Sequence, residues 1–168
     1  VHVQQICRLV EGAPLAIELA ATWLKALPCA QVARELARGI DLLATSMRDV
    51  PPRHRSMRAI LEQSWDLLAL DEQRVFRQLS IFEGGFRLEA AQAVVGAPLW
   101  VLAALVGKSM LQLAPDGRYR IHALLRQVGA EHLAALPDAV ERCKERHSEY
   151  CMAFLTEHLD GLAGHEQI

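Results

Sequence analysis

Apolar residues recur at helical spacing along most of this chain, and the spacing changes once, between Met110 and Ile121. There, two short apolar runs flank Pro115–Gly117, and a Pro-Asp-Gly sequence between such runs favours a β-hairpin. Leucine and alanine, which favour helices over strands, supply 26 and 25 of the 168 residues. The sequence therefore predicts a mainly α fold with one short β-hairpin.

Turn and cap residues divide the rest of the chain into helices. Gly12 can take the left-handed conformation that ends a helix, and Pro14 suits the first turn of the next one, where its missing N–H costs nothing. Ser56 and Asp71 are expected to cap two later helices. Helices are predicted over about residues 2–10, 14–27, 30–38, 56–68, 71–79, 88–95, 98–108, 122–136 and 137–162.

Residues 49–55 contain two adjacent prolines and predict a linker. The linker separates a helical segment at residues 1–48 from a second unit at residues 56–136, in which the last three helices before the hairpin are predicted at residues 71–79, 88–95 and 98–108. That element order is typical of a winged-helix domain. A long helix at residues 137–168 completes the predicted organisation. Because the chain starts at Val1 within a predicted helix, we expect it to be a fragment of a longer protein.

Composition argues against several classes of protein. The formal net charge of −2 does not fit a strongly basic nucleic-acid-binding protein. No apolar run reaches the roughly 18 residues that span a membrane, and no signal peptide precedes the first helix. The four cysteines form no Cys-x-x-Cys pair, so we expect a reducing, cytoplasmic setting.

Gly107-Lys108-Ser109 resembles the end of a phosphate-binding P-loop, but the first glycine of that loop would fall at Leu102. The predicted order around it, helix then strand, is also the reverse of a P-loop. No nucleophile and base occur at a spacing that marks a hydrolase. We therefore predict no catalytic residue, and no ATP hydrolysis by this chain alone.

Zinc-ligating residue types line one face of the last predicted helix, at Cys143, His147, Cys151 and His158. Apolar residues share that face, and a single helix cannot easily wrap four ligands around one ion. Packing is therefore the preferred interpretation, and no metal site is expected.

The helix before the hairpin, about residues 98–108, contains a single basic residue, Lys108. Phosphate contacts require several Lys or Arg side chains, so we expect no direct DNA binding by this chain. A basic cluster beside the linker is interpreted as solvated, with an interdomain or phosphate contact as the alternative. The cluster comprises Arg53, His54, Arg55 and Arg58.

Several segments, in the correct order, resemble the STAND signal-transduction ATPases of the NB-ARC-like class. Residues 12–21, GAPLAIELAA, resemble the Gly-x-Pro-Leu-Ala motif of that class. Residues 53–58, 64–68 and 79–86 look like the winged-helix segment of bacterial members, many of which are transcriptional regulators with a C-terminal helical-repeat sensor. Residues 119–126, YRIHALLR, are similar to the Met-His-Asp segment.

The resemblance implies that residues 1–48 end an ARC1-like helical domain, that residues 56–136 are the ARC2-like winged helix, and that residues 137–168 begin the sensor. The implied partners are an upstream P-loop domain, which would hold ADP or ATP with Mg²⁺, and the downstream sensor. The class also implies oligomerisation of the full-length protein. We expect this chain by itself to bind no cofactor, and we expect no association with a membrane.

The resemblance further implies a nucleotide site in the full-length protein at Gly12, Pro14, Leu15 and His122. Pro14 would pack on the adenine, and His122 would reach the β-phosphate and hold the closed, ADP-bound state. Ala123 departs from the family pattern, which has an acid there, so any capping role of that acid is missing or moved.

The implied function is a regulatory module of a nucleotide-dependent switch. A DNA-binding winged-helix transcription factor is the alternative, and a helical interaction scaffold without a ligand is a third interpretation.

Overall fold

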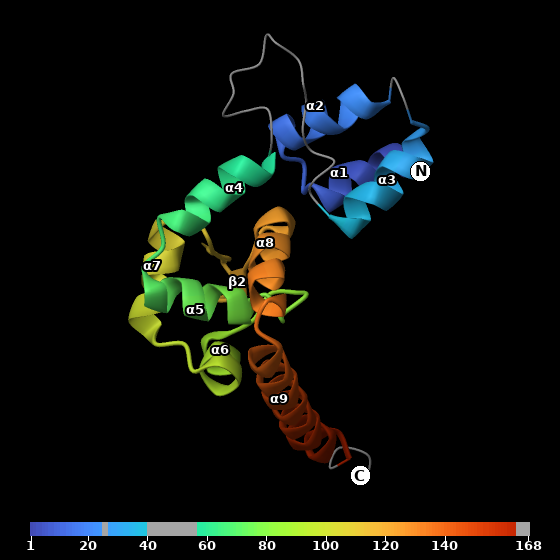
Figure 1. Ribbon diagram of the computed structural model, residues 1–168. Helices are drawn as coiled ribbons and strands as arrows, with labels where there is room; N and C mark the ends of the chain where they lie inside the picture. The colour runs from blue at the N-terminus through green and yellow to red at the C-terminus, as the bar shows by residue number, and fades with distance from the viewer. Residues whose placement is uncertain (25–26, 40–56, 164–168) are drawn as a thin grey trace.

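The computed structural model describes residues 1–24, 27–39 and 57–163, with side chains up to residue 157. This part of the chain is mainly helical with one two-stranded antiparallel hairpin, which confirms the predicted fold class (Figure 1). The helices are α1 (His2–Leu9), α2 (Pro14–Trp23), α3 (Cys29–Arg38), α4 (Met57–Asp66), α5 (Leu70–Leu79), α6 (Leu88–Val95), α7 (Leu99–Gly107), α8 (Ala123–Ala134) and α9 (Pro137–Ala163). The strands are β1 (Gln112–Leu113) and β2 (Tyr119–Arg120).

The hairpin forms where the apolar spacing changes. Leu113 pairs with Tyr119, and Gly117 supplies the left-handed turn residue with a φ of +76°. A separate antiparallel bridge joins Tyr119 to Phe86, which lies between α5 and α6. The resulting order is therefore helix α5, bridge, helices α6 and α7, and hairpin.

Several predicted helix boundaries differ from the structure by a few residues. Helix α2 ends at Trp23 rather than near residue 27. Helix α5 begins at Leu70 with Ala69 as its N-cap residue, so the predicted Asp71 cap is wrong and Asp71 lies in the first turn. The Glu72 carboxylate accepts the Ala69 N–H at 2.7 Å and so supplies the capping interaction. The predicted Ser56 cap and the linker at 49–55 lie outside the described residues.

Two hydrophobic cores meet at α8, which lies between α1–α3 and α5 in Figure 1. The N-terminal core contains apolar side chains of α1–α4 and, from α8, Leu124 and Val128. The hairpin core contains side chains of α4–α7 and Tyr119 of β2, and Leu125 of α8 packs against both cores. Helix α8 lies so close to α5 that a Cβ atom at Gly129 would be 3.2 Å from the Phe76 ring.

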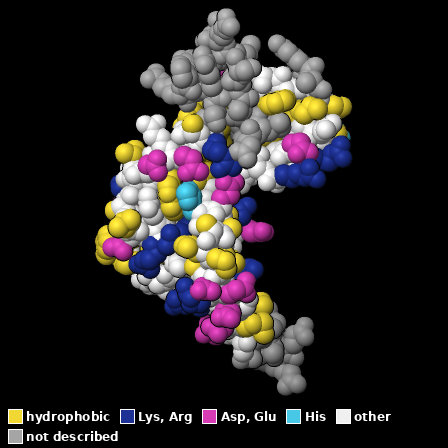
Figure 2. All heavy atoms as spheres, viewed as in Figure 1, with side chains coloured by type: hydrophobic (Ala, Val, Ile, Leu, Met, Phe, Trp, Pro, Cys, Tyr) yellow, Lys and Arg dark blue, Asp and Glu magenta, His cyan; other side chains and the backbone are white. Residues whose placement is uncertain are grey.

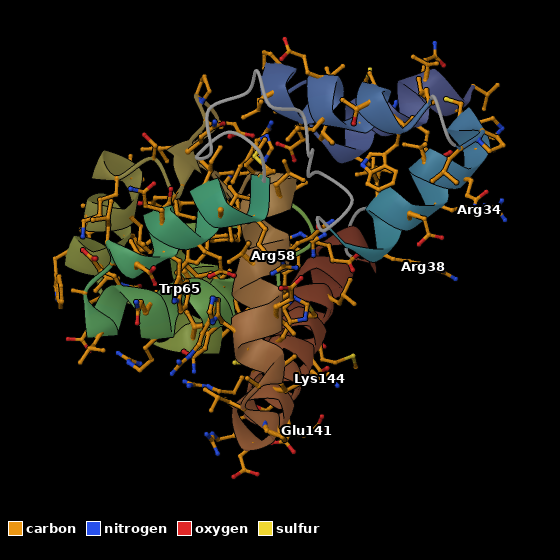
Figure 3. The ribbon with its side chains drawn as sticks, turned by 45° about the horizontal axis from the view of Figure 1, so that its top comes forward. Arg34, Arg38, Arg58, Trp65, Glu141 and Lys144 are labelled. Carbon is orange, nitrogen blue, oxygen red and sulfur yellow. The ribbon has the colours of Figure 1, made fainter. Side chains whose placement is uncertain are left out.

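A cluster of polar and aromatic side chains fixes α4 against α8. Arg58, which is labelled in Figure 3, donates two hydrogen bonds to Glu131, at 2.6 and 3.0 Å. His132 stacks on Trp65 at 4.0 Å between ring centroids and lies 3.0 Å from a Glu62 oxygen. Arg58 therefore contacts another helix, whereas the other members of the predicted basic cluster lie outside the described residues.

Lys108, the lysine of the Gly-Lys-Ser sequence, has a structural contact in this fold. Its Nζ lies 2.6 Å from a Glu72 carboxylate oxygen and 3.1 Å from the Leu67 carbonyl oxygen. The Glu72 side chain is only 7% exposed, and the hydrogen bond from Lys108 lowers its pKa by more than burial raises it. This ion pair ties the end of α7 to the start of α5.

Replacing Lys108 with alanine should lower the free energy of unfolding by about 1–2 kcal/mol, because it leaves the Glu72 carboxylate buried without its partner. The loss should shrink on acidification. Since the pKa of Glu72 is lowered in the folded state, the stabilisation is complete above its ordinary pKa and disappears as pH falls through the lowered one. Urea unfolding at several pH values measures both effects.

The matched control is Lys144→Ala, which removes an exposed i, i+3 pair with Glu141 on α9 (Figure 3). That change should stay within about 0.5 kcal/mol of the unmodified chain. Equal losses from the two substitutions, or a Lys108→Ala loss independent of pH, would contradict this account.

Candidate functional site

The turn between α1 and α2 has an unusual backbone. Glu11 and Gly12 both have positive φ angles, +47° and +74°. The Gly12 N–H donates to the Cys7 carbonyl oxygen at 2.9 Å and so ends α1, and Pro14 opens α2. Glycine adopts such a φ without a steric cost, whereas glutamate does so rarely. The turn therefore fixes Glu11 in a conformation that most residues avoid.

The predicted nucleotide residues of this turn differ in exposure. Gly12 and Pro14 are exposed to solvent, and Pro14 is the first residue of α2. Leu15 is half-buried and packs against the N-terminal core. The Pro14 ring can thus contact another molecule or domain, while Leu15 stabilises the helix behind it.

His122 is the N-cap residue of α8. Its Nδ1 accepts the Leu124 N–H at 3.3 Å, and its ring is half-buried. Its Nε2 lies 3.7 Å from one carboxylate oxygen of Glu11, and the other oxygen accepts the Ala123 N–H at 3.0 Å. The fold thus brings the turn before Pro14 beside His122, although 112 residues separate Glu11 from Ala123.

A cavity of about 330 Å³ opens at this junction. Its polar lining comes from the α1–α2 turn, the loop after α5, the hairpin and the start of α8. The lining side chains that carry or can carry charge are Glu11, Glu83, Arg120 and His122. Because a helix N-terminus favours anions, the start of α8 with His122 and Arg120 has the chemistry to bind a phosphate.

Sequence reasoning missed Glu11 as a member of this site. The sequence gives one indication, because alanine stands at position 123, where the family pattern has an acid. The Glu11 carboxylate accepts the Ala123 N–H, so a carboxylate does cap the first turn of α8, but it comes from the other end of the chain. No local spacing marks this pairing.

The cysteine and histidine face of α9 is a packed surface with one polar contact. Cys143 is buried beside Leu133 and Ala139, and burial raises the pKa of its thiol. Cys151 lies 3.8 Å from His147 Nε2. No group of three metal-ligating side chains occurs among the described residues, and His158 is a residue whose side chain is not described.

Charged side chains surround that packed face of α9, and Figure 2 shows them as mixed acidic and basic groups along the helix. Glu141, Arg142 and Lys144 are exposed around the buried Cys143. This arrangement is typical of a solvated helix with one apolar stripe.

Helix α7, which precedes the hairpin, is largely part of the hairpin core. Val101, Leu102 and Leu105 are fully buried, whereas Leu99 and Trp100 are exposed.

Within the described ranges, no single helix is long and apolar enough to cross a membrane. Helices α6 and α7 have the required apolar length only together, with a bend of 114° between them.

Gly12→Ala should lower the free energy of unfolding by about 1–2 kcal/mol, because an L-residue is disfavoured at this φ although nothing lies within 4 Å of the added Cβ. Gly39→Ala is the control, since Gly39 has an extended φ of 172° and equally open space. Its effect should stay within about 0.5 kcal/mol in urea unfolding. A harmless Gly12→Ala substitution would exclude the left-handed turn.

No model of a known protein family matches this chain. The chain is 35% identical over 162 residues to a Mycobacterium bovis protein named "Putative HTH-type transcriptional regulator", and equally to a Mycobacterium tuberculosis protein of the same name. These matches cover 90% of this chain and 18% of each relative. An uncharacterized Mycobacterium bovis protein is 32% identical over 83% of this chain and 38% of its own length. The chain thus spans about a fifth of the first relatives, and its similarity is to proteins named as transcriptional regulators.

Proposed function

We propose that this chain is the regulatory module of a STAND-class, nucleotide-dependent switch in a cytoplasmic transcriptional regulator. The observation that carries the proposal is the contact of Glu11, which directly precedes the Gly12–Pro14 segment, with the start of α8. The two segments that resemble nucleotide-contacting motifs are far apart in sequence, yet Glu11 lies beside His122, and these two residues line one cavity. A chance resemblance of either segment would not require this proximity.

In this proposal the chain supplies two contacts to a nucleotide held by an upstream P-loop domain. The exposed Pro14 ring offers an apolar edge for adenine, and His122 Nε2 offers a hydrogen bond to the β-phosphate. Mg²⁺ and the remaining phosphate contacts would come from the P-loop domain, which also supplies any hydrolysis. The nucleotide would then hold that domain against this module in a closed state.

The names of the mycobacterial relatives favour a regulatory role, and an enzymatic role for this chain has no support in its residues. The downstream partner in this proposal is a helical-repeat sensor that α9 begins. Oligomerisation would belong to the full-length protein. The relatives' length beyond the matched region leaves room for all these parts.

His122→Ala in the full-length protein should weaken ADP retention by about tenfold or more, since a hydrogen bond to a charged group contributes about 1.5–3 kcal/mol. Calorimetric titration and the rate of ADP release measure the change. His2→Ala, an exposed substitution on α1, is the control and should have no effect.

The isolated chain should bind ADP poorly, because it lacks the P-loop cradle. Unchanged ADP release from His122→Ala, or micromolar ADP binding by the isolated chain, would contradict the proposed site.

Direct DNA binding is the alternative function, since winged helices and the names of the relatives both favour it. Against it, Lys108, the residue that follows α7, donates to Glu72, and Arg118 of the hairpin donates to the Gly85 carbonyl oxygen. Each of these two cations therefore already has an intramolecular partner, which disfavours its use for phosphate contacts.

The isolated chain should show only weak, salt-sensitive association with duplex DNA. Fluorescence anisotropy titration at about 150 mM salt tests this expectation, because non-specific contacts weaken steeply with salt. Submicromolar, sequence-selective binding would favour the DNA-binding alternative over a nucleotide-controlled module.

A further inference from the structure

We infer that the Glu11 carboxylate occupies the phosphate position of the proposed nucleotide site and must leave it before a nucleotide can bind. This inference rests on the proposed function and assigns a role to a residue outside the motifs that suggested it. Glu11 would thereby set the affinity of the site and connect nucleotide binding to the α1–α2 turn.

The contacts of Glu11 are those expected of a bound anion. One carboxylate oxygen accepts the Ala123 N–H at 3.0 Å, and the other lies 3.7 Å from His122 Nε2. The Leu124 N–H is satisfied by His122 Nδ1. A phosphate that approached the start of α8 would need the Ala123 N–H and the His122 ring, and both already face Glu11.

Charge prevents Glu11 and a phosphate from sharing this position. Glu83 lines the same cavity, so two carboxylates already share it with Arg120 and His122. Arg120 is also near a carboxylate oxygen of Asp116, at 3.7 Å. A phosphate would add further negative charge within a few ångströms of Glu11, and like charges at that distance repel. Binding therefore requires the carboxylate to move out.

Glu11 is placed so that it can move. Its side chain is 46% exposed, so burial does not hold it at the site. Its φ of +47° is unfavourable for a residue with a Cβ, and the contacts with α8 offset that cost only while they last. Displacement by a phosphate would free the turn to change conformation, and this turn leads directly to Pro14 at the start of α2.

The test uses Glu11→Gln in the full-length protein, with ADP as the titrant. Glutamine keeps the size of the side chain but removes the charge that competes with the phosphate, so ADP should bind about three- to tenfold more tightly. Glu11→Ala, which removes the competing oxygens altogether, should bind ADP at least as tightly as Glu11→Gln. Glu18→Gln on α2 is the matched control, an exposed acid whose loss should leave ADP affinity unchanged.

A second measurement detects displacement directly. Hydrogen exchange of the Ala123 amide should be faster in Glu11→Ala than in the unmodified protein without nucleotide, and ADP should remove the difference. If ADP binds the Glu11 variants no more tightly than the unmodified protein, while His122→Ala still weakens binding, this inference is wrong and the proposed function stands. If ADP binds none of these proteins, the proposed function fails and this inference fails with it.

Discussion

Helix α8 is the element on which the two parts of this structure depend. Its Leu124 and Val128 side chains complete the N-terminal core, and Gly129 allows α5 to approach within contact of the helix backbone. A Cβ atom at position 129 would lie 3.2 Å from the Phe76 ring and 3.3 Å from the Ser80 side chain, so a larger residue there would force these neighbours to shift. Anything that shifts the N-terminus of α8 therefore acts on both cores.

The start of α8 is also where the chemistry of the molecule concentrates. His122 caps the helix from within, and Glu11 caps it from the α1–α2 turn. The acid that the family pattern places at position 123 is absent, and a distant acid makes the corresponding contact. In our proposal the Glu11 carboxylate and a phosphate of the nucleotide thus compete for the Ala123 N–H. Nucleotide binding would therefore change the contacts of the α1–α2 turn.

The parts of this fold that could be predicted from sequence are those with local causes. The hairpin follows from Pro115–Gly117 between apolar runs, and the helices follow from apolar spacing. The pairs Glu11–Ala123 and Arg58–Glu131 join residues 112 and 73 positions apart, and no local pattern specifies such pairs. Pro14 and His122 could be suggested as one site only through a family resemblance. The Asp71 cap predicted for α5 is wrong, because the capping carboxylate comes from the third helical residue, Glu72.

In our proposal the α1–α2 turn and the start of α8 form one nucleotide-responsive site. Hydrogen–deuterium exchange of the full-length protein, with and without ADP, tests it most directly. We predict that ADP changes exchange together in peptides covering residues 10–16 and 120–126. Changes confined to one of the two segments, or absent from both, would contradict the claim.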